Sequence, residues 1–159
     1  MKKIELRIVA LSHSVSQSNN YAVVLGEMIG LRRIPIVIGS FEAQAIAVAM
    51  EKMTPNRPLT HDLFKSFAET FNVNVIEILI YNLVEGIFYA KIICSNGALE
   101  QEIDARTSDA IALAVRFDCP IYTFESILSS AGILSDEFLE EDDELEIAET
   151  DDNEFTKMN

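Results

Sequence analysis

The sequence has 159 residues, 49% of them hydrophobic, which is enough for one well-packed core and typical of a single domain. The net charge is −14 at pH 7, which argues against a strongly basic nucleic-acid-binding domain. Residues 136–159 hold 12 acidic residues and one lysine, whereas residues 1–135 hold 14 acidic and 11 basic residues. We therefore predict a nearly neutral folded domain over 1–135 and a disordered acidic tail over 136–159.

Two sequence features bear on the cellular compartment. Charged side chains within residues 2–7 lie where a signal peptide would need apolar ones, and no apolar run approaches membrane-spanning length. Cys94 and Cys119 lie in apolar surroundings without the spacing of metal ligands, which is typical of buried free thiols. We therefore expect a cytoplasmic protein without a membrane partner.

The first part of the chain predicts an antiparallel meander. Alternating apolar and polar side chains indicate a strand with one buried face, and a turn around Gly30 joins two further apolar runs. Pro35 indicates that the last of these strands lies at an edge or begins late, because proline cannot donate a hydrogen bond within a sheet. The three predicted strands are 3–11, 21–29 and 33–38.

Two helices are predicted next. Ser40 can cap a helix that continues to about Met53, and its small alanines would let it lie close to a sheet. Thr60 suits the N-cap of the second helix, and Leu59 with Phe64 fits the spacing of a hydrophobic staple. The expected buried stripe of the second helix consists of Leu63, Phe64, Phe67, Ala68 and Phe71.

The second half of the chain again changes from strands to a helix. Glu85-Gly86 and the hairpin signal Asn96-Gly97 separate three strong strand candidates. These strands are predicted at 73–82, 86–95 and 98–103, followed by a helix at 107–118, a strand at 120–124 and a short helix within 125–134. The pattern predicts an α+β fold with a mostly antiparallel, twisted sheet of about seven strands and three main helices.

The stretch Ile103–Arg116 has a counterpart earlier in the chain. Ile38–Ala49 aligns with Ile103–Ala114 at a distance of 65 positions, and both contain Ala-Ile-Ala-x-Ala after a strand that leads into a helix. Because Ala-rich helices also recur by chance, the match fits either an internal strand-helix duplication or coincidence. The later stretch places four ionisable side chains around a helix that is otherwise almost wholly apolar, where charges are costly unless paired or used. We therefore expect it to form part of a functional site.

Three predicted helix starts carry an acid two residues after a Ser or Thr, namely Glu42, Asp62 and Asp109. A carboxylate there stabilises the helix through its dipole by about 0.3–1 kcal/mol and needs no catalytic role. If the helix starts converge on one cleft with Asp104, the same oxygens would suit Mg²⁺ or Mn²⁺, which can activate water beside a phosphate. Under this second interpretation, Glu42, Asp104 and Asp109 are the predicted metal ligands.

His61 adjoins a carboxylate, and imidazole is the side chain best suited to move protons near neutral pH. It could act as a general base or metal ligand, or be a first-turn side chain without chemistry. Arg57 and Arg106 could bind phosphate oxygens or merely neutralise the neighbouring aspartates, because guanidinium pairs well with both. Arg116, at the C-terminal end of a helix, fits a structural role.

The motifs Arg57-Pro58-Leu59-Thr60-His61-Asp62 and Ile103–Ala114 resemble those of the bifunctional nuclease family of bacteria and plants. Thr107 departs from the usual proline, with little expected consequence because both residues suit a helix start. The resemblance implies an α+β domain that cleaves RNA and DNA, and a dimer. Further matching segments are Pro35–Gly39, Glu42–Ala47 and Pro120–Tyr122, so the likeness covers roughly residues 5–130.

The sequence therefore predicts low-specificity hydrolysis of phosphodiesters in single-stranded RNA or DNA, with residues 1–135 as the bifunctional-nuclease-like domain. His61, Asp62 and Asp109 are the predicted catalytic residues, and Arg57 and Arg106 are predicted to bind the substrate. One alternative is a non-catalytic dimeric binding or regulatory module whose charged residues form a structural ion-pair network. Another is a small-molecule phosphoesterase. The sequence has no basic stripe or glycine-rich phosphate loop, which argues against sequence-specific binding to duplex.

Overall fold

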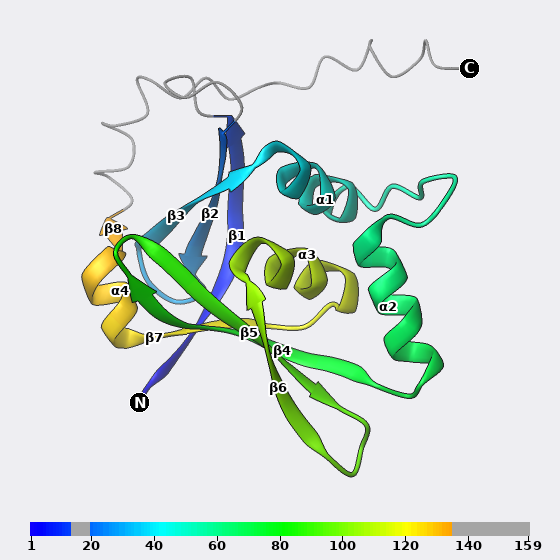
Figure 1. Cartoon of the computed structure of the whole chain (residues 1–159). Coiled ribbons are helices and arrows are strands. Elements are labelled where there is room, and N and C mark those ends of the chain that lie inside the picture. The colour runs from blue at the N-terminus through cyan, green and yellow to red at the C-terminus, as the bar shows by residue number, and fades with distance from the viewer. Residues whose placement is uncertain (14–19, 135–159) are drawn as a thin grey trace, which may run out of the picture.

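An eight-stranded sheet forms the centre of the computed structural model, which describes residues 1–13 and 20–134 (Figure 1). The strands lie in the order β6-β5-β4-β7-β1-β2-β3-β8, and every neighbouring pair is antiparallel except β4 with β7. The predicted α+β class and mostly antiparallel sheet are confirmed, with eight described strands in place of about seven. The strands are β1 (Lys3–His13), β2 (Asn20–Glu27), β3 (Arg32–Gly39), β4 (Asn74–Val84), β5 (Ile87–Ser95), β6 (Glu100–Arg106), β7 (Ile121–Phe124) and β8 (Ile133–Leu134).

The helices of the described residues are α1 (Ser40–Met50), α2 (Thr60–Thr70), α3 (Thr107–Phe117) and α4 (Glu125–Ala131). The first three correspond to the predicted main helices, and α4 ends before Gly132, so that the rest of the predicted final helix forms β8. None of these helices has both the length and the apolar character needed to cross a membrane. The predicted tail at 136–159 lies outside the described residues.

Two connections fix the strands that lead to the candidate site. Glu85 and Gly86 both have positive φ, 50° and 79°, and join β4 to β5 in a two-residue hairpin, at the position where the sequence predicted a break between two strands. The next hairpin is longer than predicted, because residues 96–99 form a four-residue connection in which Asn96 Oδ1 accepts hydrogen bonds from two backbone N–H groups. Pro35 lies on β3 beyond the short pairing with β8, in agreement with its predicted edge position.

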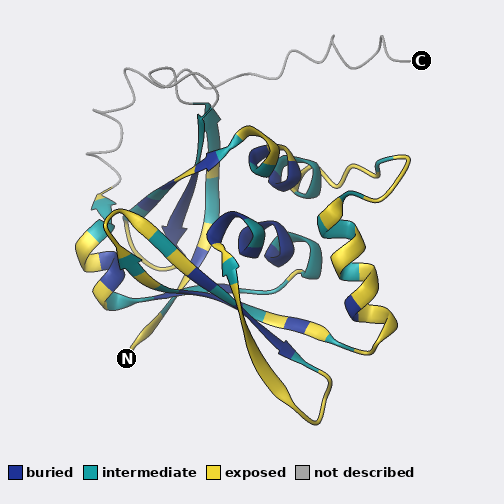
Figure 2. Cartoon of the chain, in the orientation of Figure 1, coloured by how far each residue is buried: buried dark blue, intermediate teal, exposed yellow. Residues whose placement is uncertain are grey.

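The helix α3 forms the centre of the hydrophobic core. It lies beside α1 and against the strands β4 and β5, and Figure 2 shows most of it as buried. Small side chains let α1 and α3 approach closely, as expected for Ala-rich helices packed on a sheet. The buried side chains of α3 include Ala110, Ile111, Ala112, Leu113 and Ala114. Burial of these side chains fixes the position of the first turn of α3, which directly follows β6.

The predicted buried stripe of α2 is wrong. Leu63, Phe67 and Phe71 are between 61% and 64% exposed, and Phe64 is 36% exposed. Ala68 is the buried residue of this helix, and Figure 2 shows its outer surface as exposed. Periodicity identified an apolar face correctly, but α2 packs on the side of α3 and not on the sheet. Its aromatic side chains therefore remain outside the core.

The two strand-helix units have the same layout, with a register that differs from the sequence match. The helices α1 and α3 begin at Ser40 and Thr107, which are 67 positions apart, whereas the Ala-Ile-Ala-x-Ala match used 65. Gly39 and Arg106 occupy the N-cap positions, so the predicted Ser and Thr caps are wrong by one residue. As a result, Glu42 and Asp109 are both the third residue of their helices.

Candidate active site

Asp109 lies in the first turn of α3, three residues after Arg106 at the end of β6. The Arg106 guanidinium binds this carboxylate with two hydrogen bonds, 2.7 Å from Nε to Oδ2 and 3.1 Å from Nη2 to Oδ1. Burial alone would raise the pKa of Asp109, but hydrogen bonds from Arg106 and then His61 hold it below its ordinary value. The carboxylate is therefore ionised at neutral pH.

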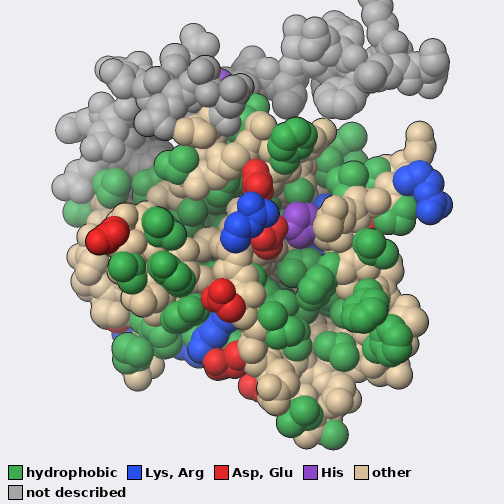
Figure 3. Space-filling model, in the orientation of Figure 1, with side chains coloured by type: hydrophobic (Ala, Val, Ile, Leu, Met, Phe, Trp, Pro, Cys, Tyr) green, Lys and Arg blue, Asp and Glu red, His purple; other side chains and the backbone are tan. Residues whose placement is uncertain are grey.

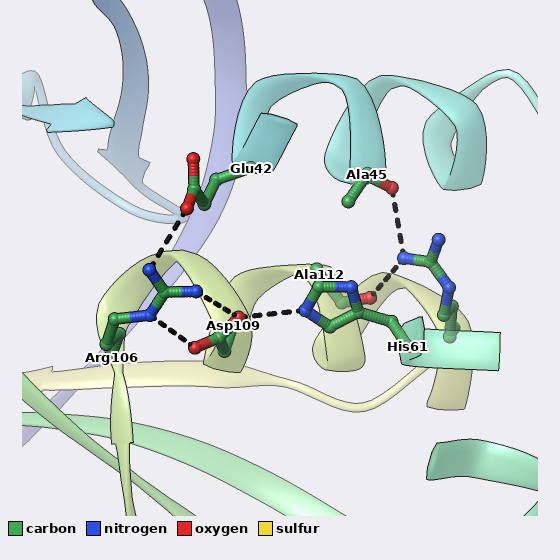
Figure 4. Close-up of polar contacts among 7 residues, drawn as sticks. Glu42, Ala45, His61, Arg106, Asp109 and Ala112 are labelled. Carbon is green, nitrogen blue, oxygen red and sulfur yellow. Dashed lines mark hydrogen bonds and ion pairs between the residues drawn. The ribbon is translucent and has the colours of Figure 1, made fainter. Parts of the chain in front are cut away.

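Arg106 also reaches the first turn of α1. Its Nη1 lies 3.0 Å from Oε1 of Glu42, so one guanidinium joins the starts of the two helices (Figure 4). These contacts use three of the five N–H groups that a guanidinium carries. Because the side chain is 66% exposed, the remaining N–H groups can donate to an anionic ligand.

His61, the second residue of α2, completes the cluster. Its Nε2 lies 2.9 Å from Asp109 Oδ1, and its side chain is 17% exposed. An ionised carboxylate can only accept, so Nε2 carries the hydrogen, and in the neutral form of the ring Nδ1 is the nitrogen with the lone pair. Figure 4 shows Asp109 between the guanidinium of Arg106 and the imidazole ring. The pair therefore has the arrangement of a general base oriented by a carboxylate.

These side chains surround a hollow of about 330 Å³, which we call the His61 pocket. On one face of the molecule, Figure 3 shows basic, acidic and histidine side chains together, bordered by hydrophobic ones. Some lining residues were not predicted, because only the packing of α1 and α2 on α3 brings them to the pocket. The lining consists of Phe41, Glu42, Gln44, Ala45, Leu59, Thr60, His61, Arg106 and Asp109.

A second hollow of about 450 Å³ lies next to the first, and Glu42 and Arg106 line both. Residues 35–39 of β3 and residues 86–88 around the start of β5 form most of its wall. This wall is largely apolar, and its side chains Val37 and Ile87 are 68% and 62% exposed to solvent. The Glu42–Arg106 ion pair therefore lies between two hollows on the surface.

Asp62 takes no part in the cluster, although it follows His61 directly. Its Oδ1 lies 2.8 Å from Nε of Arg116, and its Oδ2 accepts a hydrogen bond of 2.9 Å from the N–H of Leu59. Burial alone would raise the pKa of Asp62, but these two donors lower it. The side chain of Arg116, only 5% exposed, also donates to the carbonyls of Ala45 and Ala112. This arrangement ties α2 to α1 and α3.

Two other predicted site residues lie away from the pocket. Asp104 is exposed on β6, where its Oδ1 accepts a hydrogen bond of 3.2 Å from the hydroxyl of Tyr81. Arg57 is exposed between α1 and α2 and is not among the lining residues. The structure therefore brings together His61, Asp109, Arg106 and Glu42, but neither Asp104 nor Arg57.

The predicted metal ligands do not form a common site. Glu42 and Asp109 both bind the Arg106 guanidinium, while Asp104 contacts Tyr81. Over residues 1–13 and 20–134, no group of three or more His, Cys, Asp or Glu side chains is arranged to hold a metal ion. Since Mg²⁺ and Mn²⁺ need several oxygen ligands, this arrangement does not fit them.

Comparisons with known proteins place the cluster within a described family. Residues 23–136 match the family model described as "Bifunctional nuclease domain". The chain is 40% identical over 131 residues to two proteins of Mycobacterium tuberculosis, named Uncharacterized protein MT1877 (strain CDC 1551 / Oshkosh) and Uncharacterized protein Rv1829 (strain ATCC 25618 / H37Rv). The aligned region covers 82% of this chain and 77% of each relative. All four residues of the cluster lie within the matched segment.

Proposed function

Since the chain belongs to the bifunctional nuclease domain family, we propose that the His61 pocket hydrolyses phosphodiester bonds of single-stranded RNA or DNA with low sequence specificity. The observation that supports this proposal is the hydrogen-bonded cluster of His61, Asp109 and Arg106 in a pocket open to solvent. It combines a base, a carboxylate that orients the base, and a cation for phosphate.

In the proposed reaction, Nδ1 of His61 removes the proton from the attacking hydroxyl, which belongs to water or to the neighbouring ribose of RNA. Asp109 stabilises the imidazolium that forms, because its carboxylate accepts the hydrogen bond from Nε2. Arg106 donates its remaining N–H groups to the non-bridging phosphate oxygens, whose negative charge increases in the transition state. The leaving oxygen takes its proton from solvent or from the imidazolium.

The two hollows beside Arg106 favour a polymeric substrate. A phosphate bound at Arg106 would have space on both sides, about 330 Å³ and about 450 Å³, for the flanking nucleosides. A small phosphoester would need only one of these hollows. We therefore favour a polynucleotide over the small-molecule alternative.

The charge of the cluster favours one other function, a non-catalytic binding module. Glu42 and Asp109 carry two negative charges, and Arg106 neutralises only one of them. A phosphate would therefore meet local repulsion while His61 is neutral. In this second function the ion pairs serve to hold α1, α2 and α3 together.

The test compares wild type with His61→Ala and Asp109→Asn on single-stranded RNA and DNA, with and without EDTA. We expect cleavage to fall about 10²- to 10⁴-fold in both variants, which is the usual contribution of a general base. Asp118→Asn is the matched control, because Asp118 is exposed at the opposite end of α3. Equal cleavage by all preparations would indicate a contaminating nuclease and would favour the second function. Turnover of a generic phosphodiester alone would indicate the small-molecule phosphoesterase.

A dimeric state and a cytoplasmic location also stay predictions of the sequence. Sedimentation equilibrium over a range of protein concentrations measures the first directly. The chain has a mass of 17.8 kDa. If it forms a dimer, we expect twice this mass at concentrations above the dissociation constant.

A further inference from the structure

Phe41 is the most exposed aromatic side chain in the described part of the protein. It is the second residue of α1, and 83% of its surface is open to solvent. Single exposed apolar side chains are common on protein surfaces, so the exposure by itself needs no function. The position of this one is unusual, because Phe41 lines the His61 pocket together with Arg106, His61 and Asp109.

Phe41 also lines a third hollow, of about 390 Å³, which shares Phe41 and Gln44 with the His61 pocket. Leu11, Tyr21 and Ala47 are among the residues on the wall of that hollow. The aromatic side chain therefore stands between two concave surfaces, one of which contains the proposed catalytic cluster. A flat ligand stacked on it would have open space beside it.

The neighbouring residue links Phe41 to the phosphate position. Glu42 follows it directly and binds Nη1 of Arg106. An aromatic side chain and a guanidinium in one pocket are the two groups that bind single strands without sequence preference, the ring by stacking on a base and the cation by pairing with phosphate. Every base has a π-face, so such a contact tolerates all sequences.

We propose that the ring of Phe41 stacks on a nucleobase of a single-stranded polynucleotide whose adjacent phosphate lies at Arg106. The inference rests on the proposed function, since it names the substrate contact of the same pocket. The stacking contact would favour single strands over duplex, because both faces of a base inside a duplex are already covered by its neighbours. Phe41 is thus a substrate-binding residue and takes no part in proton transfer.

The absence of tryptophan from the sequence makes this contact measurable without catalysis. Phe41→Trp introduces a single indole whose emission is quenched when a base stacks on it. Phe67→Trp is the matched control, because Phe67 is 64% exposed on α2 and does not line the pocket. Both substitutions are made in the His61→Ala background, so that an eight-nucleotide strand stays intact during the titration.

We expect saturable quenching of the Phe41→Trp emission by single-stranded DNA and RNA, weaker quenching by a duplex of the same sequence, and no change in the Phe67→Trp protein. In the otherwise wild-type chain, Phe41→Ala and Phe41→Leu should weaken oligonucleotide binding about 5- to 150-fold in competition experiments, while Phe41→Tyr retains it. The Tyr variant separates loss of stacking from misfolding, which circular dichroism of all three variants also checks.

Quenching without any cleavage by the wild-type chain would support the stacking contact and overturn the proposed hydrolysis. Cleavage and binding at wild-type levels in Phe41→Ala, with no quenching of Phe41→Trp, would overturn the stacking contact and leave hydrolysis intact. Emission that changes with protein concentration in the absence of oligonucleotide would overturn the inference as well, because a second copy of the chain would then cover the ring.

Discussion

Arg106 reaches the carboxylate of Glu42, a residue 64 positions earlier in the chain, with Nη1 3.0 Å from Oε1. A Cβ at position 39 would overlap Oε2 of Glu42, so another residue in place of Gly39 would require the end of this side chain to shift. The same guanidinium holds Asp109, so the two equivalent acids of the two strand-helix units share one cation. The proposed phosphate position therefore lies between two carboxylates.

Neutralising Glu42 should strengthen substrate binding. Glu42→Gln removes a negative charge beside the proposed phosphate site and keeps the shape of the side chain. With the screening of bulk water, the repulsion between this charge and a phosphate costs about 1 kcal/mol, so the Kd for a single-stranded oligonucleotide should fall roughly fivefold. Fluorescence anisotropy at low salt measures the effect, and high salt should reduce it. Weaker binding by Glu42→Gln would indicate that Glu42 serves mainly to orient Arg106.

Arg106 should be sensitive to the shape of the cation as well as to its charge. Arg106→Ala should lower kcat/KM about 10²- to 10³-fold, because it removes the group that stabilises charge on the phosphate. Arg106→Lys retains a positive charge but cannot bind two carboxylates and a phosphate in a fixed geometry. Its kcat/KM should therefore recover less than about a tenth of the value that Arg106→Ala loses. Urea unfolding serves as the control, since exposed ion pairs contribute only about 0–1 kcal/mol to stability.

Asp62 should affect stability more than catalysis. Asp62→Asn keeps one carbonyl oxygen, so it can accept from the N–H of Leu59 or from Arg116 but not from both, and it loses the negative charge, at an expected cost of about 1 kcal/mol. Arg116→Met leaves Asp62 without its cation and should cost about 3 kcal/mol. Because Asp62 does not line the His61 pocket, kcat should stay within about tenfold at a temperature where Asp62→Asn is folded. A loss as large as that of Asp109→Asn would restore Asp62 as a catalytic residue.

Arg106 should compete with divalent cations for the same oxygens. Arg106→Ala frees the Glu42 and Asp109 carboxylates, so Mn²⁺ should bind this variant more tightly than wild type. The electron paramagnetic resonance signal of free Mn²⁺ measures the difference. The double variant Arg106→Ala/Glu42→Gln should lose the added affinity. Tighter Mn²⁺ binding by wild type would mean that the ion finds other ligands.

The protein should lose stability in acid through a second cluster. Arg32 binds Glu125 at 2.6 Å and the buried Glu27 at 2.7 Å. Hydrogen bonds from Arg32 lower the pKa of Glu27 and lower that of Glu125 from 4.5 to about 2. Both groups hold fewer protons when folded, so their stabilisation is complete above pH 4.5 and is lost as the pH falls toward 2. Urea midpoints across this range should decline less steeply for Glu125→Gln, and an unchanged slope would contradict the assignment.

Several parts of the local structure could be predicted from residue order. The break between two strands falls at Glu85 and Gly86 as predicted, and the acids Glu42, Asp62 and Asp109 lie in first turns as their spacing after Ser or Thr indicates. The buried stripe on α2 could not be predicted in the same way. Helical periodicity identifies an apolar face, but burial also requires another element to cover it, and that depends on where the helix packs.

The sequence by itself determined the α+β class, the family, and the set of charged side chains available at the helix starts. Only the tertiary structure decided their partners: Arg106 for Glu42 and Asp109, Arg116 for Asp62, and Tyr81 for Asp104. The physical reason is that a helix or a turn depends mainly on residues close in sequence, whereas these partners are brought together by packing. A hydrogen bond between His61 and Asp109, 48 positions apart, exists only because the packing of α2 on α3 brings their first turns together.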